Sequence, residues 1–427
     1  MTSKREYIIQ FNIICLGEPG SHAEECSVGL IAPRLDVIKP SPSMAVTARA
    51  IEMRAAGIDV VSLSAGEPDF ATPPHIVEAA YAAMRRGETR YTAVDGTAAL
   101  KKAVVGKFRR ENGLDYAASQ ISVAGGAKQI IYNALLATLA PGDEVVVPAP
   151  YWVSYTDIVL LGEGKPVVVA CTEAEGFKLA PQALRAAITG RTKWLLLNTP
   201  SNPTGAVYSR DELAGLAAVL LDHPHVHVLT DDIYEHILFD GRAFHTIAGV
   251  EPRLKDRTLT VNGVSKAYAM TGWRIGYAGG PEPLIRAMAT VQSQSTSNPS
   301  SISQAATIAA LEGPQDFLRP RALEFQARRD RALELLRAVP GLTCQTPEGA
   351  FYLYPNCSAL IGRRRPDGTP IGSDDDLALY LLDQARVAVV QGSAYGLSPY
   401  FRISIATSMD LIEKAIGRIG EAVEALR

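Results

Sequence analysis

The sequence predicts an α/β protein with two parts: a large domain built on a mostly parallel central sheet flanked by helices, and a smaller α+β domain. Three observations support this class. From residue 59 onward, short runs rich in Val, Leu and Ile alternate with helical segments, as expected for strands buried on both faces. Most of these runs end in loops rich in Gly, Pro and Asn, which is where α/β proteins bind ligands. After Pro314 the alternation stops and a mainly helical region begins.

The length of 427 residues indicates more than one domain. We expect a large domain over residues 66–314 and a smaller one formed by residues 31–65 together with 315–427. Residues 1–30 are expected to form a loosely ordered extension. Charged residues make up 20% of the chain and the net charge is −3. The sequence therefore does not predict the basic surface that nucleic acid binding requires.

The five cysteines are scattered and include no CxxC pair. This pattern fits free thiols in a reducing compartment, so we expect a cytoplasmic protein without a metal site. The apolar run at residues 7–16 is interrupted by Gln10 and Asn12, and no convincing cleavage site follows, so a signal peptide is not expected. No stretch reaches the roughly 20 apolar residues of a helix that spans a membrane.

The first predicted elements are a helix over residues 45–56 and a strand over residues 59–64. The strand stops at the loop of residues 65–69, which is rich in turn formers. Gly66 in this loop is either an ordinary turn glycine or a ligand contact. Two helices are predicted next, over residues 74–86 and 98–111.

A short predicted strand over residues 121–124 runs into Gly125, Gly126, Ala127 and Lys128, where another helix begins. The start of a helix offers free backbone N–H groups and the positive end of the helix dipole to an anion. The spacing matches neither a nucleotide P-loop nor the GxGxxG fingerprint. We therefore predict an anion site of another kind, to which Lys128 adds a charge.

Four more strands are predicted over residues 144–147, 193–197, 225–229 and 258–261. Because the carboxyl ends of parallel strands share one edge of a sheet, the residues just beyond these ends are expected to meet. These residues are Trp152, Asn202, Asp231, Tyr234 and Lys266.

Arg274 follows Lys266 by eight residues and can reach the same place if the backbone folds back over Gly272. Taken alone, Lys266 and Arg274 are equally well interpreted as solvated loop charges.

Beyond Pro314 we expect a long helix over residues 317–338, a small α+β region and a closing helix over residues 410–426. Arg402 lies inside one of the apolar strands predicted there. A half-buried guanidinium needs an anion, which is either a substrate carboxylate or a nearby acidic side chain in a structural salt bridge. The strands predicted in this region cover residues 351–354, 387–390 and 401–405.

The residues expected at the sheet edge meet the needs of pyridoxal phosphate. The aldehyde of this cofactor forms a Schiff base with a lysine, here Lys266, and a carboxylate, here Asp231, keeps its ring nitrogen protonated. Tyr234 and Asn202 can donate hydrogen bonds to the ring oxygen, and Trp152 can stack on the ring.

The cofactor phosphate would rest on the helix start at Gly126, Ala127 and Lys128, with Arg274 across it. Arg402 would then hold the carboxylate of a substrate.

Nine motifs occur in order along the chain: SAGEPDF (64–70), YTAVDG (91–96), GGAKQ (125–129), PAPYWVSY (148–155), NTPSNPTGA (198–206), TDDIYEH (230–236), NGVSKAYAMTGWRIGY (262–277), PEGAFYLYP (347–355) and FRIS (401–404). With these motifs the chain from residue 31 onward resembles the class I, fold-type I pyridoxal-phosphate-dependent aminotransferases. Within that family it most resembles the bacterial aspartate aminotransferases, which include aspartate/prephenate bifunctional members.

The resemblance implies a homodimer with shared active sites, in which Tyr91 reaches the phosphate of the neighbouring subunit. It also implies that the Gly66 N–H binds the substrate α-carboxylate, helped by Asn202 and Arg402. The distal carboxylate would be held by Ser41, in a KPS segment, together with Lys128; Lys39 is a weaker candidate. The full set of substrate residues implied in this way is Gly66, Trp152, Asn202, Arg402, Ser41 and Lys128.

The predicted reaction moves the amino group of an amino acid, with aspartate as the first choice, to 2-oxoglutarate in a ping-pong mechanism. Its catalytic residues are Lys266, Asp231 and Tyr234, with Lys266 as both cofactor anchor and proton shuttle. Ala305 stands where close relatives tend to carry tryptophan, which bears on the side-chain pocket.

Two alternatives keep the cofactor: an aspartate/prephenate or aromatic aminotransferase, and a pyridoxal-phosphate-dependent lyase. A related sensor would need an attached DNA-binding domain, for which the first 30 residues are too few. A dehydrogenase would need a glycine fingerprint that the sequence lacks.

Overall fold

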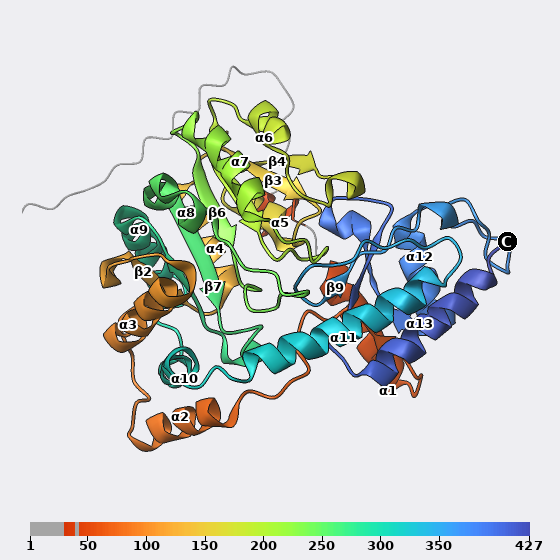
Figure 1. The fold of residues 1–427 in the computed structure, drawn as a ribbon, viewed down its shortest axis with the longest axis horizontal. Helices are drawn as coiled ribbons and strands as arrows, with labels where there is room; N and C mark the ends of the chain where they lie inside the picture. Colours follow the sequence, from red (N-terminus) through yellow and green to blue (C-terminus); the bar gives the residue numbers. More distant parts are fainter. Residues whose placement is uncertain (1–29, 39–41) are drawn as a thin grey trace, which may run out of the picture.

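The computed structural model describes residues 30–38 and 42–427 of the chain, so the extension expected at residues 1–30 lies almost wholly outside the described residues. The largest feature is the central sheet (Figure 1). It has seven strands in the order β2-β8-β7-β6-β5-β3-β4. Its strands are β2 (Ile121–Ala124), β3 (Glu144–Ala149), β4 (Lys165–Ala170), β5 (Thr192–Asn198), β6 (His227–Asp231), β7 (Thr258–Gly263) and β8 (Gly276–Gly279).

Six of these seven strands run in the same direction. The pairs β3/β4, β3/β5, β5/β6 and β6/β7 are parallel, whereas β8 is antiparallel to both of its neighbours, β7 and β2. The prediction of a mostly parallel sheet is therefore confirmed. Because β2, β3, β5, β6 and β7 point the same way, the segments that follow them all start at one edge of the sheet.

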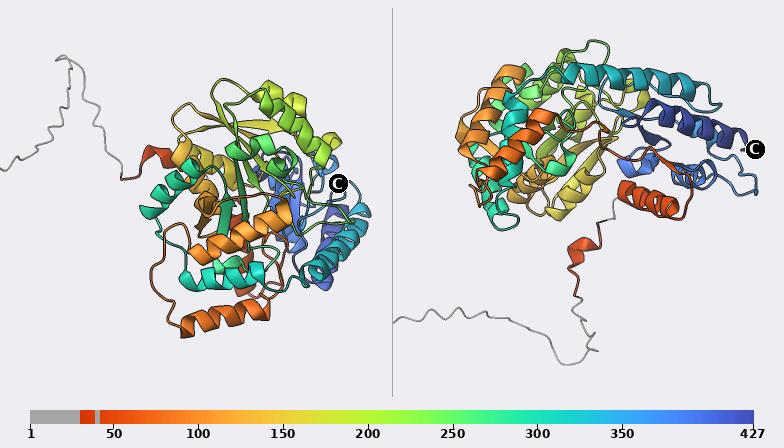
Figure 2. Two further views of the ribbon diagram at one scale, coloured as in Figure 1. Left: turned by 60° about the vertical axis from the view of Figure 1, so that its left-hand side comes forward. Right: turned by 90° about the horizontal axis from the view of Figure 1, so that it is seen from below.

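Helices cover both faces of the sheet (Figures 1 and 2), and alternate side chains of each strand pack on opposite faces. Val145 and Val147 of β3 face α4, α5 and α9, while Val146 faces the side of α6, α7 and α8. Near β2 the second face is covered by α2, α3 and α10. These helices are α2 (Pro74–Arg85), α3 (Ala98–Lys107), α4 (Ala127–Thr138), α5 (Ser154–Leu161), α6 (Pro181–Ala187), α7 (Arg210–Leu221), α8 (Ile247–Val250), α9 (Glu282–Ser293) and α10 (Ser301–Glu312).

The long helix α11 (Leu318–Arg337) leads from the seven-stranded sheet to a second group of elements (Figure 1). The early strand β1 (Val61–Ser62) pairs there with the late strand β10 (Val387–Ala388). This pairing joins two of the segments assigned to the smaller domain; the division into domains itself stays a prediction. The other elements of this group are α1 (Pro42–Ala55), β9 (Tyr352–Leu353), α12 (Asp374–Tyr380), β11 (Val390–Gln391), β12 (Phe401–Ser404) and α13 (Met409–Glu424).

The structure differs from the sequence expectation at two strands of the large sheet. β4 was not expected, and neither was β8, whose four residues include Gly276 and Gly279. Glycine is depleted in strands, so this pattern does not predict one. The packing explains why this strand contains glycine. A Cβ at Gly276 would lie 2.2 Å from the backbone nitrogen of Ala127, and a Cβ at Gly279 would lie 2.3 Å from the ring of Tyr116.

Cys171, Cys344 and Cys357 are buried free thiols, as the sequence predicts, while the other two cysteines lie outside the described residues. Burial raises the pKa of each of the three thiols to about 12, which keeps them protonated and unreactive. None of the helices in the described residues combines the length and the apolar character needed to cross a bilayer.

The contact of Gly276 with the start of α4 leads to a stability prediction. We expect Gly276→Ala to lower the free energy of unfolding by about 3 kcal/mol, because the new methyl group meets backbone atoms that cannot turn aside. Gly417 is the matched control, because it lies on the exposed side of α13 and a Cβ added there would meet no atom within 4 Å. Gly417→Ala should raise the free energy of unfolding by about 0.5–1 kcal/mol. Urea unfolding measures both. Equal stability of Gly276→Ala and the unmodified protein would contradict the packing argument.

Candidate active site

A cavity of about 420 Å³ opens at the carboxyl edge of the sheet. Loops that follow β3, β5, β6 and β7 contribute to it, together with the start of α4 and strands β9 and β12. Its lining residues are Ser64, Ala65, Gly66, Glu67, Ala127, Lys128, Trp152, Val153, Ser154, Tyr155, Asn198, Asn202, Asp231, Ile233, Tyr234, Ser265, Lys266, Thr271, Arg274, Tyr352 and Arg402.

Lys266 lies three residues beyond the end of β7, and its amine points into the cavity. The Nζ atom donates a hydrogen bond of 2.7 Å to the carbonyl oxygen of Gly66. Burial lowers the pKa of this amine to about 8, and the nearby charge of Arg402 adds to the effect, against the opposing influence of Asp231. A sizeable fraction of the amine is therefore neutral near pH 8, and only a neutral amine can act as a nucleophile or a base.

Asp231 is the last residue of β6, and its side chain is buried at the floor of the cavity. Tyr155 donates a hydrogen bond of 2.8 Å from its hydroxyl to Oδ2, while Oδ1 is buried without a hydrogen-bond partner in the described residues. Burial raises the pKa of this carboxyl group to about 6, although the hydrogen bond from Tyr155 opposes the shift. A donor or a positive charge placed in the cavity beside Oδ1 would relieve the cost of this buried carboxylate.

Tyr234 and Tyr352 form a pair at one wall of the cavity. Their hydroxyl oxygens lie 2.9 Å apart, and burial raises the pKa of the Tyr234 hydroxyl well above its ordinary value. Lys266 Nζ lies 5.7 Å from the centre of the Tyr234 ring. The two hydroxyl groups thus stay protonated, and together they can offer a donor to a group placed next to the lysine amine.

The start of α4 forms a corner suited to an anion. Gly126 is the N-cap residue with φ 108° and provides no side-chain cap, so the first N–H groups of the helix are left to a ligand. Arg274 lies against this turn and donates a hydrogen bond of 3.1 Å to the carbonyl oxygen of Gly125. A Cβ at Gly126 would lie 2.5 Å from Arg274 Nη2, so only glycine lets the guanidinium come this close.

Lys128 reaches the cavity from the same corner and lies 4.8 Å from the centre of the Trp152 ring. Burial and the neighbouring Arg274 lower the pKa of its amine. The corner therefore gathers two cationic side chains.

Arg402 of β12 is only 4% exposed and forms a second place for an anion. Its Nη1 donates a hydrogen bond of 3.0 Å to Asn202 Oδ1, its Nη2 donates to the carbonyl oxygen of Ser64, and its Nε is buried without a partner in the described residues. The guanidinium carbon also lies 4.5 Å from the ring centre of Tyr352. No carboxylate of the described residues pairs with Arg402, so the alternative of a structural salt bridge finds no support there.

Most of the site residues expected from the sequence meet in this cavity, namely Gly66, Ala127, Lys128, Trp152, Asn202, Asp231, Tyr234, Lys266, Arg274 and Arg402. Gly126 is not among the lining residues; it is the N-cap of α4 and immediately precedes Ala127. Tyr91 does not line this cavity, and its side chain is 92% exposed. Ser41 and Lys39 lie outside the described residues.

Sequence reasoning missed Tyr155 and Tyr352. Tyr155 lies near the start of α5, only three residues after Trp152, so its closeness in sequence to that predicted residue could have placed it beside the cavity. Tyr352 reaches the site from β9, more than 80 residues after Lys266. It lies within the motif PEGAFYLYP, from which no role was predicted for this tyrosine.

Comparisons with known proteins agree on one family. The family model "Aminotransferase class I and II" matches residues 58–419. The chain is 58% identical over 395 residues to an aspartate aminotransferase of Rhizobium meliloti. The alignment covers 92% of this chain and 96% of the relative. It is 56% identical over 392 residues to an aspartate/prephenate aminotransferase of Cereibacter sphaeroides. This alignment covers 92% of this chain and 98% of the relative.

Solved structures with the same fold include two enzymes of this kind. The crystal structure of the aspartate aminotransferase from Rhizobium meliloti superposes with a TM-score of 0.91 at 57% identity and covers 93% of this chain and 99% of that one. The aspartate aminotransferase of Thermus thermophilus, solved with maleate, has a TM-score of 0.86 at 42% identity and covers 92% and 99%. The fold expected from the sequence resemblance is confirmed by these neighbours.

The buried carboxylate of Asp231 should reduce the stability of the protein without ligand. At pH values above its pKa of about 6, the folded protein carries a charge that costs less in the unfolded chain, where the carboxyl group titrates near its ordinary 3.8. We expect Asp231→Asn to raise the free energy of unfolding by up to about 3 kcal/mol at pH 8 and by about half of that at pH 5.

Urea unfolding at the two pH values measures this difference. Asp143 provides a control of opposite sign, because the hydrogen bond from Lys193 lowers its pKa and Asp143→Asn should therefore lose stability at pH 8. A loss of stability at pH 8 in Asp231→Asn would show that the carboxylate is better accommodated than its surroundings indicate.

Proposed function

Since the chain belongs to the class I and II aminotransferase family and is an aminotransferase, we propose that it uses pyridoxal phosphate to move the amino group of aspartate to 2-oxoglutarate. The single observation that carries the proposal is the cavity in which the amine of Lys266 faces the buried carboxylate of Asp231, with an anion corner beside them.

The described residues fit this cofactor. Asp231 Oδ1, which is buried without a partner among them, would accept a hydrogen bond from the protonated ring nitrogen, and Trp152 offers a flat surface for stacking on the ring. Gly126, Ala127 and Arg274 would hold the phosphate through the first N–H groups of α4 and the guanidinium. Pyridoxal phosphate, when bound, supplies an electron sink for the cleavage of a bond at the substrate α-carbon.

Lys266 supplies both the attachment point and the base. With a pKa near 8, its Nζ exists partly as the neutral amine at working pH and can take the proton from the α-carbon of the amino acid. The hydroxyl of Tyr234, paired with Tyr352, stays protonated and provides a hydrogen-bond donor beside this amine.

The substrate would be held at its two ends. Arg402 and Asn202, already hydrogen-bonded to each other, would bind the α-carboxylate, with the backbone N–H of Gly66 as a further donor. Lys128 at the opposite corner would bind the distal carboxylate of aspartate, together with Ser41, which lies outside the described residues. The Thermus thermophilus neighbour was solved with maleate, itself a four-carbon dicarboxylate, and this supports the choice of a dicarboxylic substrate.

We further propose a homodimer in which Tyr91 binds the phosphate at the partner's site. The exposure of Tyr91 in the single chain leaves its hydroxyl free to do so. The cytoplasmic location stays a prediction.

Replacing Lys266 tests the assigned reaction. We expect Lys266→Ala to lower kcat by at least about 10⁴-fold and to remove the visible absorbance that develops when pyridoxal phosphate is added to the unmodified protein. Thermal unfolding checks that the variant is folded. If the variant retained turnover or the absorbance, another lysine would have to be the attachment point and the assignment of Lys266 would be wrong.

A pair of variants tests how the substrate is held. Lys128→Met should lower kcat/KM for aspartate by about 100-fold and leave that for alanine within about threefold, because only aspartate has a second carboxylate. Arg402→Lys should lower both values by a similar factor, because the α-carboxylate is common to both substrates.

Half-reactions at saturating cofactor measure these values, and prephenate is included among the acceptors to test the second activity named for the Cereibacter sphaeroides relative. Equal losses for aspartate and alanine in Lys128→Met would contradict the role of Lys128. Release of pyruvate or ammonia without an acceptor would indicate a lyase instead.

A further inference from the structure

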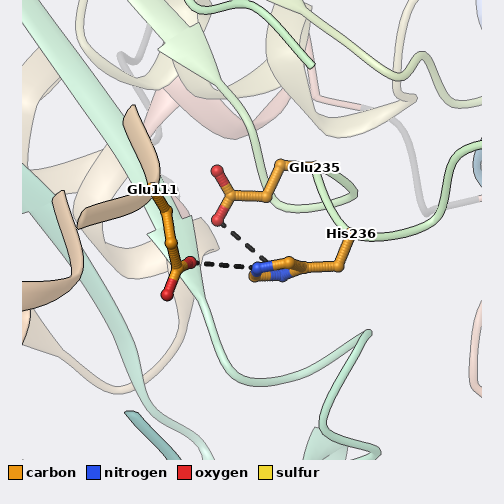
Figure 3. Close-up of side chains that lie close together, drawn as sticks. All are labelled: Glu111, Glu235 and His236. Carbon is orange, nitrogen blue, oxygen red and sulfur yellow. Dashed lines mark hydrogen bonds and ion pairs between the residues drawn. The ribbon is translucent and has the colours of Figure 1, made fainter. Parts of the chain in front are cut away.

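A cluster of charged side chains, of which Lys107 and Glu235 are buried and Glu111 and His236 half-buried, adjoins the turn that carries Asp231 and Tyr234. Figure 3 shows Glu235 and His236 of this turn facing Glu111, which comes from the π-helical turn Phe108–Asn112 at the end of α3. Glu111 Oε2 lies 3.0 Å from His236 Nε2, and His236 Nδ1 lies 3.8 Å from Glu235 Oε1.

The three side chains of Figure 3 resemble a metal site, because their ligand atoms lie within 4.8 Å of one another. Lys107 argues against a metal. Its Nζ forms an ion pair with Glu235 and lies 3.5 Å from Glu111 Oε2, so an ammonium group already stands where a cation would bind. Arg110 also pairs with Glu111, which leaves two cations facing two carboxylates. A divalent ion would be repelled by this arrangement.

The contacts of Glu235 instead indicate a role in positioning the turn that follows β6. Oε1 of its carboxylate forms an ion pair with Lys107 but has no hydrogen-bond partner among the described residues, and Asn112 donates a hydrogen bond of 2.7 Å to Oε2. Lys107 also donates a hydrogen bond of 2.7 Å to Asn112 Oδ1, which closes a ring of three side chains. The side chain of Lys107 is fully buried and that of Glu235 is 3% exposed, so water does not replace these contacts. Burial alone would raise the pKa of Glu235, but the charges of Lys107 and His236 outweigh it and hold the pKa below its ordinary value.

The backbone connects this ring of contacts to the cavity. Glu235 follows Tyr234 directly, and its N–H donates to the carbonyl oxygen of Asp232 at 3.0 Å, which tightens the turn after Asp231. The carbonyl oxygen of Asp231 is held from the other side by Asn198 Nδ2 at 2.7 Å. A shift of Glu235 would therefore move the side chains of Tyr234 and Asp231 within the cavity.

We propose that the Lys107–Glu235 ion pair, completed by Asn112, is a positioning element that holds the turn of residues 231–236 so that Asp231 and Tyr234 face the cofactor ring. The inference rests on the proposed function. An ion pair with two directional hydrogen bonds defines an orientation, whereas apolar packing at the same place would fill the space without defining one.

Three variants separate positioning from folding. Lys107→Met and Glu235→Gln each leave a buried charge without its nearest partner, so both should lower the melting temperature. The double variant Lys107→Met/Glu235→Gln buries no charge of this pair and should recover much of the melting temperature. In all three, the dissociation constant for pyridoxal phosphate should rise by about tenfold or more and kcat should fall by about 10- to 100-fold, because a small misplacement of ring-binding groups has a large effect. KM for aspartate should change little, since Arg402 and Asn202 are not touched.

Cofactor affinity is measured by equilibrium dialysis and by the visible absorbance of the bound cofactor. Asn112→Ala, a milder change at the half-exposed member of the ring, replaces the single variants if these do not fold. Lys178→Met is the matched control, because Lys178 also stands between two glutamates, Glu212 at 3.1 Å and Glu348 at 3.3 Å, at a place that does not line the cavity. It should leave cofactor affinity and kcat unchanged.

The outcomes distinguish a failure of the positioning role from a failure of the proposed function. If the double variant recovers cofactor affinity and kcat along with the melting temperature, or if the variants alter only the melting temperature, the pair is merely structural and the inference is wrong. If the unmodified protein itself does not bind pyridoxal phosphate, the proposed function fails and the inference fails with it.

Discussion

The site depends on the common direction of the strands in the central sheet. Parallel hydrogen bonding from β3 through β5 and β6 to β7 places the carboxyl ends of these strands side by side, and β2 joins them across the antiparallel β8. Each chain segment that leaves this edge starts within reach of the others. As a result, Asp231 and Lys266 meet although 35 residues separate them, and no long loop has to cross the protein to bring them together.

Charges that are expensive to bury are concentrated at this edge. Asp231 lacks a partner for one carboxylate oxygen, Lys266 has a lowered pKa, and Arg402 is buried without a carboxylate among the described residues. Each of these features costs stability in the protein without ligand, and each is of the kind that a charged ligand relieves. A ligand with a positive ring nitrogen, a phosphate and a carboxylate would complement all three, so the same groups that weaken the empty cavity favour the binding of such a ligand.

The turn after β6 contributes side chains to two places, the cavity and the charged cluster. Asp231 and Tyr234 face the cavity, while Glu235 and His236 face the charged cluster with Lys107 and Glu111. Asp231, Tyr234 and Glu235 are buried, and the turn is short, so its orientation depends on contacts on both sides. None of the four side chains of the charged cluster lines the cavity, which is consistent with a role in orientation and not in chemistry.

The sequence by itself determined the class of fold, the ends of five strands of the central sheet to within two residues, and ten of the residues that line the cavity. These follow from local patterns such as apolar runs that end in turns, and from the motifs shared with a known family. Only the tertiary structure decided which groups contact each other. Tyr155 and Tyr352 reach Asp231 and Tyr234 from distant segments, and Lys107 contacts Glu235 from a helix more than 120 residues earlier in the chain. β8 is a strand because it pairs with β2 and β7, and it carries Gly276 because a side chain there would meet the start of α4. Contacts of this kind depend on packing between elements far apart in the chain, and the periodicity of one segment carries no information about the partner it will meet.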